Sequence, residues 1–285
     1  MLAGGFSPPP LAVQTGLSVP DLFVTRNETV LDLWRHGLER LSTLGLVRDR
    51  LCLCGGSTPV PQSTRGTFRT VVDRGDYRGP VGVVRDACEE LAPDETILIA
   101  EAARCCRADL SEIVSAHVRR GADVTVGRAP DQSPSGVYVA RRSTLDEVPP
   151  AGFMDMKEQW FSRLIKKGRR VLVHEMGAGA IMAARTRAEF LLAALGLDSE
   201  GVVAIEPRVV RGAGVTRSVV CDGASVSDRA IVVDSVVMPG AEIGEGSLVV
   251  RSIVAPGRRV DAGRTLVDTV AGPGGESGRL GGGAS

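Results

Sequence analysis

The sequence predicts an α/β domain with a mostly parallel sheet, followed by a short β-helix. Two observations carry this prediction. Over residues 1–198, segments rich in β-branched residues alternate with amphipathic helical segments, which is typical of a mostly parallel sheet covered by helices on both faces. Over residues 199–274, one short motif recurs at 17-residue intervals, which is typical of a solenoid of parallel strands.

Each element of the first domain has its own local signal. Helices are expected near 29–44, 80–91, 109–121, 155–167 and 186–196, and strands at 96–100, 123–126, 136–140 and 170–174. Asp109 with Glu112, and Thr186 with Glu189, have the spacing of a capping box and predict two helix starts. His117 lies on an apolar helical face, so we expect a core residue rather than a catalytic base.

The second domain is defined by its repeat. Segments 218–226, 235–243 and 252–260 begin alike and lie 17 residues apart. Four residues share one phase of the repeat and should form an interior column: Val209, Val226, Ile243 and Val260. The spacing resembles the hexapeptide repeats of left-handed β-helices and allows about four coils. The glycine-rich segment 275–285 is expected to be a disordered tail.

Composition excludes several classes of function. Lys+Arg and Asp+Glu both number 34, so the neutral chain is expected to bind neither nucleic acid nor a membrane surface. No apolar run is long enough to span a bilayer and no signal peptide is visible, which favours a cytoplasmic protein. The six cysteines form no CxxC pair, so we interpret them as small buried thiols.

Motifs spread over the α/β segment resemble those of sugar-phosphate nucleotidyltransferases, the NDP-sugar pyrophosphorylases. The motifs, in chain order, are Leu2-Ala-Gly-Gly5, 18–24, 79–86, 109–126, 136–139, 155–158 and 186–190. The resemblance implies a Rossmann-like nucleotidyltransferase domain, and members often carry a C-terminal left-handed β-helix. Only Met1 and Leu2 precede the glycine loop, so the first strand is either a stub or begins upstream.

The resemblance also implies where substrates would bind. The family joins a nucleoside triphosphate to a sugar 1-phosphate and releases pyrophosphate. It would place phosphate and nucleotide contacts at Leu2, Ala3, Gly4, Gly5, Gly79 and Gly82. Lys157 and Glu158 would be the candidate contacts to the sugar phosphate, although Asp155 and Glu158 are favoured as a helix cap.

The chain departs from the family pattern where the chemistry should be. The phosphate-binding Arg falls in the proline run at Pro9, and the phosphate-facing Lys falls on Val19. The two metal-binding aspartates fall on Ala103 and Ala183, which leaves Glu101 as the one nearby substitute. Because a cation bridging the phosphates would have no anchor, we expect no catalytic residue, no metal and no cofactor. The favoured interpretation is a non-catalytic or strongly impaired homologue that acts as a regulatory or structural subunit or as a nucleotide-sugar sensor.

Two alternatives stay open. An active enzyme could use unusual ligands, since Glu101, Asp86 and Arg85 lie near suitable positions, and it would then need Mg²⁺. A hexapeptide-repeat acyltransferase is the weakest alternative, because that chemistry commonly uses a histidine base in the solenoid and no histidine follows His174.

Assembly is expected through the β-helix. Val219, Val236 and Ile253 are interpreted as a flat apolar flank suited to packing against another solenoid. The expected partner is either a second copy of the chain or an active nucleotidyltransferase relative.

Overall fold

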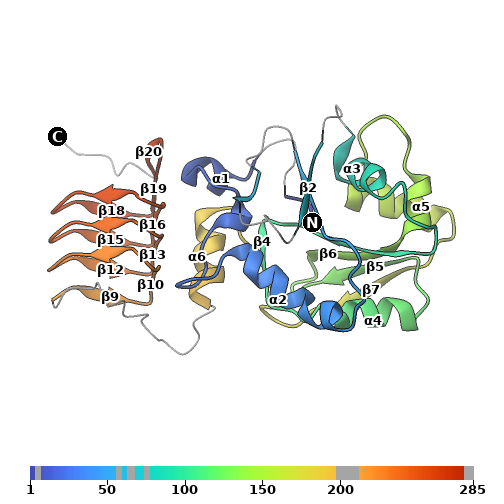
Figure 1. The fold of residues 1–285 in the computed structure, drawn as a ribbon, viewed down its shortest axis with the longest axis horizontal. Coiled ribbons are helices and arrows are strands. Elements are labelled where there is room, and N and C mark those ends of the chain that lie inside the picture. Colours follow the sequence, from blue (N-terminus) through green and yellow to red (C-terminus); the bar gives the residue numbers. More distant parts are fainter. Residues whose placement is uncertain (4–7, 56–59, 63–67, 74–77, 197–211, 279–285) are drawn as a thin grey trace. The chain divides into compact units, whose positions relative to one another are not determined.

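The protein was analysed as a computed structural model that describes residues 1–3, 8–55, 60–62, 68–73, 78–196 and 212–278 (Figure 1). The chain divides into two compact units. Unit 1 comprises Met1–Pro8 and Leu31–Met182, and unit 2 comprises Pro9–Val30 and Ala183–Ser285. No helix among the described residues is both long and apolar enough to cross a membrane.

Unit 1 is built around a mixed sheet. One part pairs β1 (Leu51–Cys54) with β2 (Arg69–Val72), and the other has the order β3 (Thr96–Ala100), β6 (Pro134–Arg141), β5 (Val124–Arg128) and β7 (Val171–Glu175). Strand β6 is antiparallel to both of its neighbours, whereas β1–β2 and β5–β7 are parallel. Leu2 forms parallel bridges to Leu53 and to Glu101 and so joins the two parts. Strands β4 (Arg104–Cys106) and β8 (Ile181–Ala183) form a separate pair.

Helices pack on both faces of this sheet, because successive strand residues point to opposite sides. The helices are α2 (Val30–Thr43), α3 (Gly79–Ala87), η3 (Arg142–Glu147), η4 (Met156–Trp160) with α5 (Phe161–Lys166), and α4 (Ser111–Arg119). On one face Leu53 and Val124 pack with apolar residues of α3, η4 and α5. Helices α2 and α4 lie on the other face (Figure 1). There Cys52 and Cys54 pack against α2, and Thr125 meets His117 of α4.

The predicted helix starts are confirmed. Helix α4 begins two residues after Asp109, whose Oδ1 accepts from Ser111 N at 2.9 Å, although the N-cap residue is Leu110 and its side chain makes no capping bond. At α6 (Arg187–Gly196), Glu189 Oε2 accepts from Thr186 N at 3.0 Å while Glu189 N donates to Thr186 Oγ1 at 3.3 Å. His117 is buried, and its Nδ1 lies 3.0 Å from Thr125 Oγ1, so it is the expected core residue.

Unit 2 contains a β-helix whose coils are linked by parallel ladders, each residue pairing with the residue 17 positions on. The first sheet has strands β10 (Val219–Val220), β13 (Val236–Val237), β16 (Ile253–Val254), β19 (Thr269–Gly272) and β20 (Gly275–Gly278). The second has β11 (Ser225–Val226), β14 (Glu242–Ile243) and β17 (Arg259–Val260). The third has β9 (Gly214–Thr216), β12 (Ile231–Val233), β15 (Leu248–Val250) and β18 (Thr265–Val267).

The predicted interior column is confirmed where the structure describes it. Val226, Ile243 and Val260 are buried in one apolar cluster inside the coils. Val209, the fourth expected member, lies outside the described residues. The repeat register read from the sequence is therefore the register of the strands.

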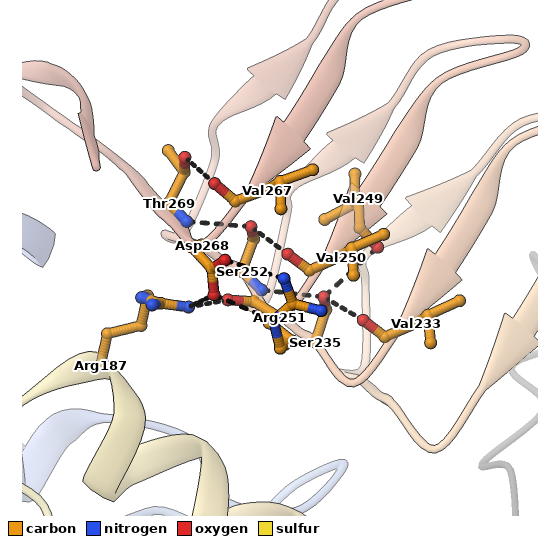
Figure 2. Close-up of polar contacts among 10 residues, drawn as sticks. All are labelled: Arg187, Val233, Ser235, Val249, Val250, Arg251, Ser252, Val267, Asp268 and Thr269. Carbon is orange, nitrogen blue, oxygen red and sulfur yellow. Dashed lines mark hydrogen bonds and ion pairs between the residues drawn. The ribbon is translucent and has the colours of Figure 1, made fainter. Parts of the chain in front are cut away.

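A second column inside unit 2 consists of hydroxyl side chains. Each of Ser218, Ser235 and Ser252 accepts a hydrogen bond, at 3.0–3.1 Å, from the backbone N–H of the residue 17 positions on. Figure 2 shows the steps at Ser235 and Ser252. The same hydroxyls donate to the carbonyl oxygens two residues earlier, at 2.7–2.8 Å, and Thr269 does the same at 2.9 Å. This hydroxyl ladder satisfies polar groups that the corner would otherwise bury unpaired.

The end of the β-helix differs from the expectation. Residues 275–278 were expected in a disordered tail, but they form β20, which pairs antiparallel with β19. Gly275, with φ of 103°, allows the tight reversal, and Arg264 holds Glu276 through bonds of 3.2 and 2.9 Å. The strand covers an edge that would otherwise expose unpaired backbone groups. Residues 279–285 lie outside the described part.

The unit boundaries also differ from the expected division at 198/199. Segment Pro9–Val30 and helix α6 belong to unit 2. The segment includes α1 (Pro10–Thr15) and η1 (Val19–Asp21), and α1 approaches β19 so closely that a Cβ on Gly272 would lie 1.7 Å from Gln14 O. Arg187 of α6 contacts Asp268 at 3.0 Å (Figure 2). These contacts attach both segments to the β-helix.

The prediction of an exposed apolar flank is also wrong, because this flank is buried within unit 2. Val219, Val236 and Ile253 alternate with interior residues and point outward from the first sheet, yet their exposed fractions are 4%, 0% and 0%. Nearby, Cys221 Sγ lies 3.6 Å from Thr25 O, and Asp222 N donates to Arg26 O at 3.0 Å. The flank is an internal surface of unit 2 and is not available to a partner.

Candidate functional site

The most concentrated polar site in unit 1 surrounds Glu101, directly after β3. Its Oε1 accepts from the Tyr138 hydroxyl at 3.1 Å and lies 3.3 Å from Lys157 Nζ. Its Oε2 accepts from Arg104 Nε at 3.0 Å. We call these four residues the Glu101 cluster. Both carboxylate oxygens of Glu101 are engaged by donors from the same chain.

Three elements and a glycine hold the cluster together. Glu101 follows β3, Tyr138 lies in the adjacent strand β6, and Arg104 opens β4. Gly136 has a φ of 80°, and a Cβ there would lie 2.3 Å from Arg104 Nε and 3.0 Å from Glu101 Oε2. A larger residue at position 136 would therefore disrupt the ion pair.

Lys157 reaches Glu101 from the π-helix η4. Asp155 begins this helix as an N-cap, because its Oδ1 accepts from Lys157 N at 2.7 Å and from Glu158 N at 2.8 Å. The predicted cap is confirmed. Lys157, a candidate contact to the sugar phosphate, directs its ammonium toward Glu101, and its side chain is 41% exposed. Glu158 is exposed. The contact seen for it is the hydrogen bond from its backbone N to Asp155 Oδ1.

Electrostatics keep Glu101 ionised. Burial by itself would raise the pKa of Glu101, but the charges and hydrogen bonds of Arg104 and Lys157 outweigh it and hold the pKa below the ordinary 4.5. Burial raises the pKa of Tyr138, and the Glu101 carboxylate raises it further. The phenol therefore stays protonated and serves as a donor. The cluster therefore combines a carboxylate held in its ionised form with a phenol held in its protonated form.

Of the other predicted binding residues, Leu2 lies beside the cluster through its parallel bridge to Glu101, whereas Gly79 and Gly82 belong to α3. Leu2 and Ala3 contribute backbone bonds to the sheet, whereas Gly4 and Gly5 lie outside the described residues. Gly79 has a φ of 70°, and a Cβ there would lie 2.5 Å from Met154 O. Gly82 lies inside α3 near Arg78. Packing alone accounts for both of these glycines.

The two substitute groups considered for an active enzyme are also engaged. Asp86 accepts from Arg85 Nη2 at 2.6 Å and contacts Arg78 through its other oxygen. Arg85 Nη1 donates to Pro149 O at 2.5 Å. Asp86 and Arg85 thus connect α3 to the segment after η3, which gives them a structural role.

The two positions at which the resemblance would place metal-binding aspartates have no carboxylate. Ala103 and Ala183 are both partly buried and have aliphatic side chains. Within the described ranges, no group of three or more His, Cys, Asp or Glu side chains could hold a metal ion. Glu101 is the remaining carboxylate of this set, and two cations already neutralise it.

The cysteines agree with their interpretation as buried thiols. All six are buried and none forms a disulfide. Burial raises the pKa of Cys105 and of Cys106 to about 12, so neither thiol forms a thiolate at neutral pH.

Sequence reasoning missed Arg104 and Tyr138 as partners of Glu101. The signal for Arg104 was its position three residues after the carboxylate. Tyr138 pairs across the strands with Ile99, two residues before Glu101, a register that a single sequence does not reveal. The hydroxyl ladder was visible in principle, because its members recur every 17 residues.

Comparison with known proteins bears on the second unit. A family model described as GlmU-like, C-terminal hexapeptide, matches residues 196–268. No curated protein matches the chain. The match agrees with the parallel 17-residue coils and shows a hexapeptide-repeat domain in the second unit.

Proposed function

We propose that this protein is a non-catalytic or strongly impaired homologue of sugar-phosphate nucleotidyltransferases that acts as a regulatory or structural subunit or as a nucleotide-sugar sensor. The single observation that supports it most is the Glu101 cluster. In an active member, the carboxylates at this end of the sheet would bind the cation that bridges the phosphates. Here Glu101 is occupied by Arg104, Lys157 and Tyr138.

A magnesium ion does not fit these residues. Mg²⁺ requires near-octahedral oxygen ligands, usually including one or two carboxylates. Ala103 and Ala183 offer none, and an ion at Glu101 would lie beside two cationic side chains. Removing Glu101 from Arg104 would also leave the guanidinium of a side chain that is only 15% exposed without its carboxylate, which is costly.

The α/β unit and the β-helix would each have a separate role. The α/β unit would be a Rossmann-like domain that has kept the nucleotidyltransferase scaffold without its phosphate-binding groups. The β-helix would be left-handed, as in hexapeptide-repeat proteins, and would provide assembly with itself or with an active relative. The hexapeptide family match to residues 196–268 supports the second part.

The test is pyrophosphate release by the full chain, with Mg²⁺, across a panel of nucleoside triphosphates and sugar 1-phosphates. The proposal predicts no turnover above the rate without protein. Turnover that disappears in the Glu101→Gln variant would overturn it and would favour an active enzyme that uses Glu101 as a ligand.

A further inference from the structure

A pocket of about 310 Å³ lies in unit 1, away from the Glu101 cluster. Helix α2 lines it with residues at the i, i+3, i+4 and i+7 positions of a single helical face. These residues are Arg35, Leu38, Glu39 and Ser42. Arg50, directly before β1, and Phe68, directly before β2, line it as well. The pocket is therefore at the amino ends of these two strands, whereas Glu101 follows the carboxyl end of β3.

Phe68 and Leu38 give the pocket an apolar part. Both pack with Cys52 and Cys54 on this face of the sheet, and Phe68 is 9% exposed. A ligand that carries a flat apolar group can remove the remaining apolar surface from water by lying against the aromatic ring. The volume is at the small end of the range for ligand pockets, so the ligand must be small.

Arg50 is held in place by neutral groups. Its Nη2 donates to Ser42 Oγ at 2.6 Å, and Ser42 Oγ donates to Leu38 O at 2.8 Å. Within the described ranges, no carboxylate forms an ion pair with Arg50. Because the side chain is partly buried and already oriented, its guanidinium can bind a ligand carboxylate with little further loss of side-chain entropy.

Glu39 supplies the opposite charge. Its side chain is exposed, and it forms no ion pair with any cation that the structure describes, Arg50 included. Arg35 is balanced from its own helix, because its Nη1 donates to Asp32 Oδ1 at 2.8 Å. Arg50 and Glu39 thus present opposite charges in one pocket, beside an apolar surface, without neutralising each other.

We propose that this pocket binds a small zwitterion with an apolar body, of the class of free α-amino acids with an aromatic side chain. The carboxylate pairs with Arg50, the ammonium pairs with Glu39, and the side chain lies against Phe68 and Leu38. A simple anion would engage Arg50 alone, and a simple cation would engage Glu39 alone. The inference is independent of the proposed loss of catalysis. For so small a ligand at a partly open site, we expect a dissociation constant of about 1 mM.

The first experiment is an NMR titration of backbone amide signals of the full chain with three ligands. L-phenylalanine is the zwitterion, 3-phenylpropionate lacks the ammonium, and 2-phenylethylamine lacks the carboxylate. L-phenylalanine should shift the signals of Leu38 and Ser42, and the other two ligands should bind about tenfold more weakly. No shift at the pocket with L-phenylalanine up to about 30 mM, or equal affinity for all three ligands, would overturn the proposal.

The second experiment assigns each charge to its residue. Glu39→Gln should weaken L-phenylalanine about tenfold without weakening 3-phenylpropionate, and Arg50→Gln should weaken it about tenfold without weakening 2-phenylethylamine. Glu90→Gln, at an exposed position of the same unit that does not line the pocket, is the matched control and should change nothing.

Circular dichroism and thermal melting show whether each variant folds. A folded variant that weakens all three ligands equally would overturn the assignment of the charges, because general loosening of the pocket would explain it. If a variant does not fold, the three-ligand comparison on the wild-type chain still decides the proposal.

Discussion

The Glu101 cluster and the hydroxyl ladder satisfy buried polar groups in opposite ways. In the cluster, one carboxylate meets three different donors from three elements, and each contact occurs once. In the ladder, one hydroxyl contact recurs every 17 residues from Ser218 to Thr269. A repeated contact tolerates loss at one step, whereas a unique cluster fails as a whole. The predictions below test that difference, from the largest expected effect to the smallest.

The largest effect is expected inside the β-helix, with Val226→Asp. Val226 is fully buried among apolar side chains, so the new carboxylate would be buried without a partner. We expect the free energy of unfolding of unit 2 to fall by about 4 kcal/mol or more. Hydrogen–deuterium exchange resolved by segment, in increasing urea, measures this. Ser225→Asp, one residue away and only partly buried, is the control and should change it little.

A wild-type exchange pattern in Val226→Asp would contradict the assigned register of the coils. A register shifted by one residue would reverse the two variants, making Ser225→Asp the damaging change.

A smaller effect is expected at the cluster, with Glu101→Ala. Removing the carboxylate leaves Arg104 and the Tyr138 hydroxyl without their acceptor, and we expect a loss of about 2–3 kcal/mol in unit 1. Urea unfolding followed by exchange in unit 1 provides the measurement. An unchanged stability would mean that the cluster is not formed in solution.

The same carboxylate should make unit 1 sensitive to acid. Because the folded pKa of Glu101 lies below 4.5, its contribution is fully present above that value and is lost as the pH falls through the folded pKa. The wild-type unit 1 should therefore lose stability below pH 4.5, and Glu101→Gln should remove part of that loss. If the stability of both proteins fell with pH in the same way, the pKa of Glu101 would not be lowered in the folded state.

One step of the hydroxyl ladder should cost less. Ser235→Ala removes the acceptor of Ser252 N, which is buried, and we expect a loss of about 1–2 kcal/mol in unit 2. Ser235→Thr should cost less, because Thr269 makes the same bond to a carbonyl at the equivalent position. Melting of the two variants gives the comparison. If Ser235→Thr were as damaging as Ser235→Ala, the loss of stability would come from the change in side-chain volume and not from the lost hydrogen bond.

The smallest effect is expected at Asp268, at a corner of the β-helix where it pairs with Arg251 and Arg187. Arg251, Arg187 and their hydrogen bonds lower the pKa of Asp268 to about 2, yet its side chain is 38% exposed. Exposed ion pairs of this kind contribute little to stability, so Asp268→Asn should change the melting temperature of the protein only slightly. Its contribution is present above the ordinary 3.8 and is lost as the pH falls toward about 2. A large loss at pH 7 would show that Arg187 needs this carboxylate to hold α6 on the β-helix.

The sequence predicts the β-helix repeat in more detail than it predicts the Glu101 cluster. A period of 17 places Val226, Ile243 and Val260 in one column whatever the rest of the chain does, and it fixes the strand register. It does not reveal that segment Pro9–Val30 returns to the β-helix, where Asp222 N donates to Arg26 O, because the two residues are 196 positions apart. Capping at Asp155 was predictable from local spacing, whereas the meeting of Tyr138 and Lys157 at Glu101 depends on the tertiary fold.

The central claim is that the Glu101 cluster occupies the position where an active relative would hold a metal ion. Calorimetry of the full chain with MgATP, MgGTP and MgUTP tests this most directly. The account predicts dissociation constants no better than millimolar for all three, and the same weak binding in Glu101→Gln. A micromolar affinity that requires Mg²⁺ and is lost in Glu101→Gln would contradict it, because Glu101 would then leave Arg104 and Lys157 to bind the cation.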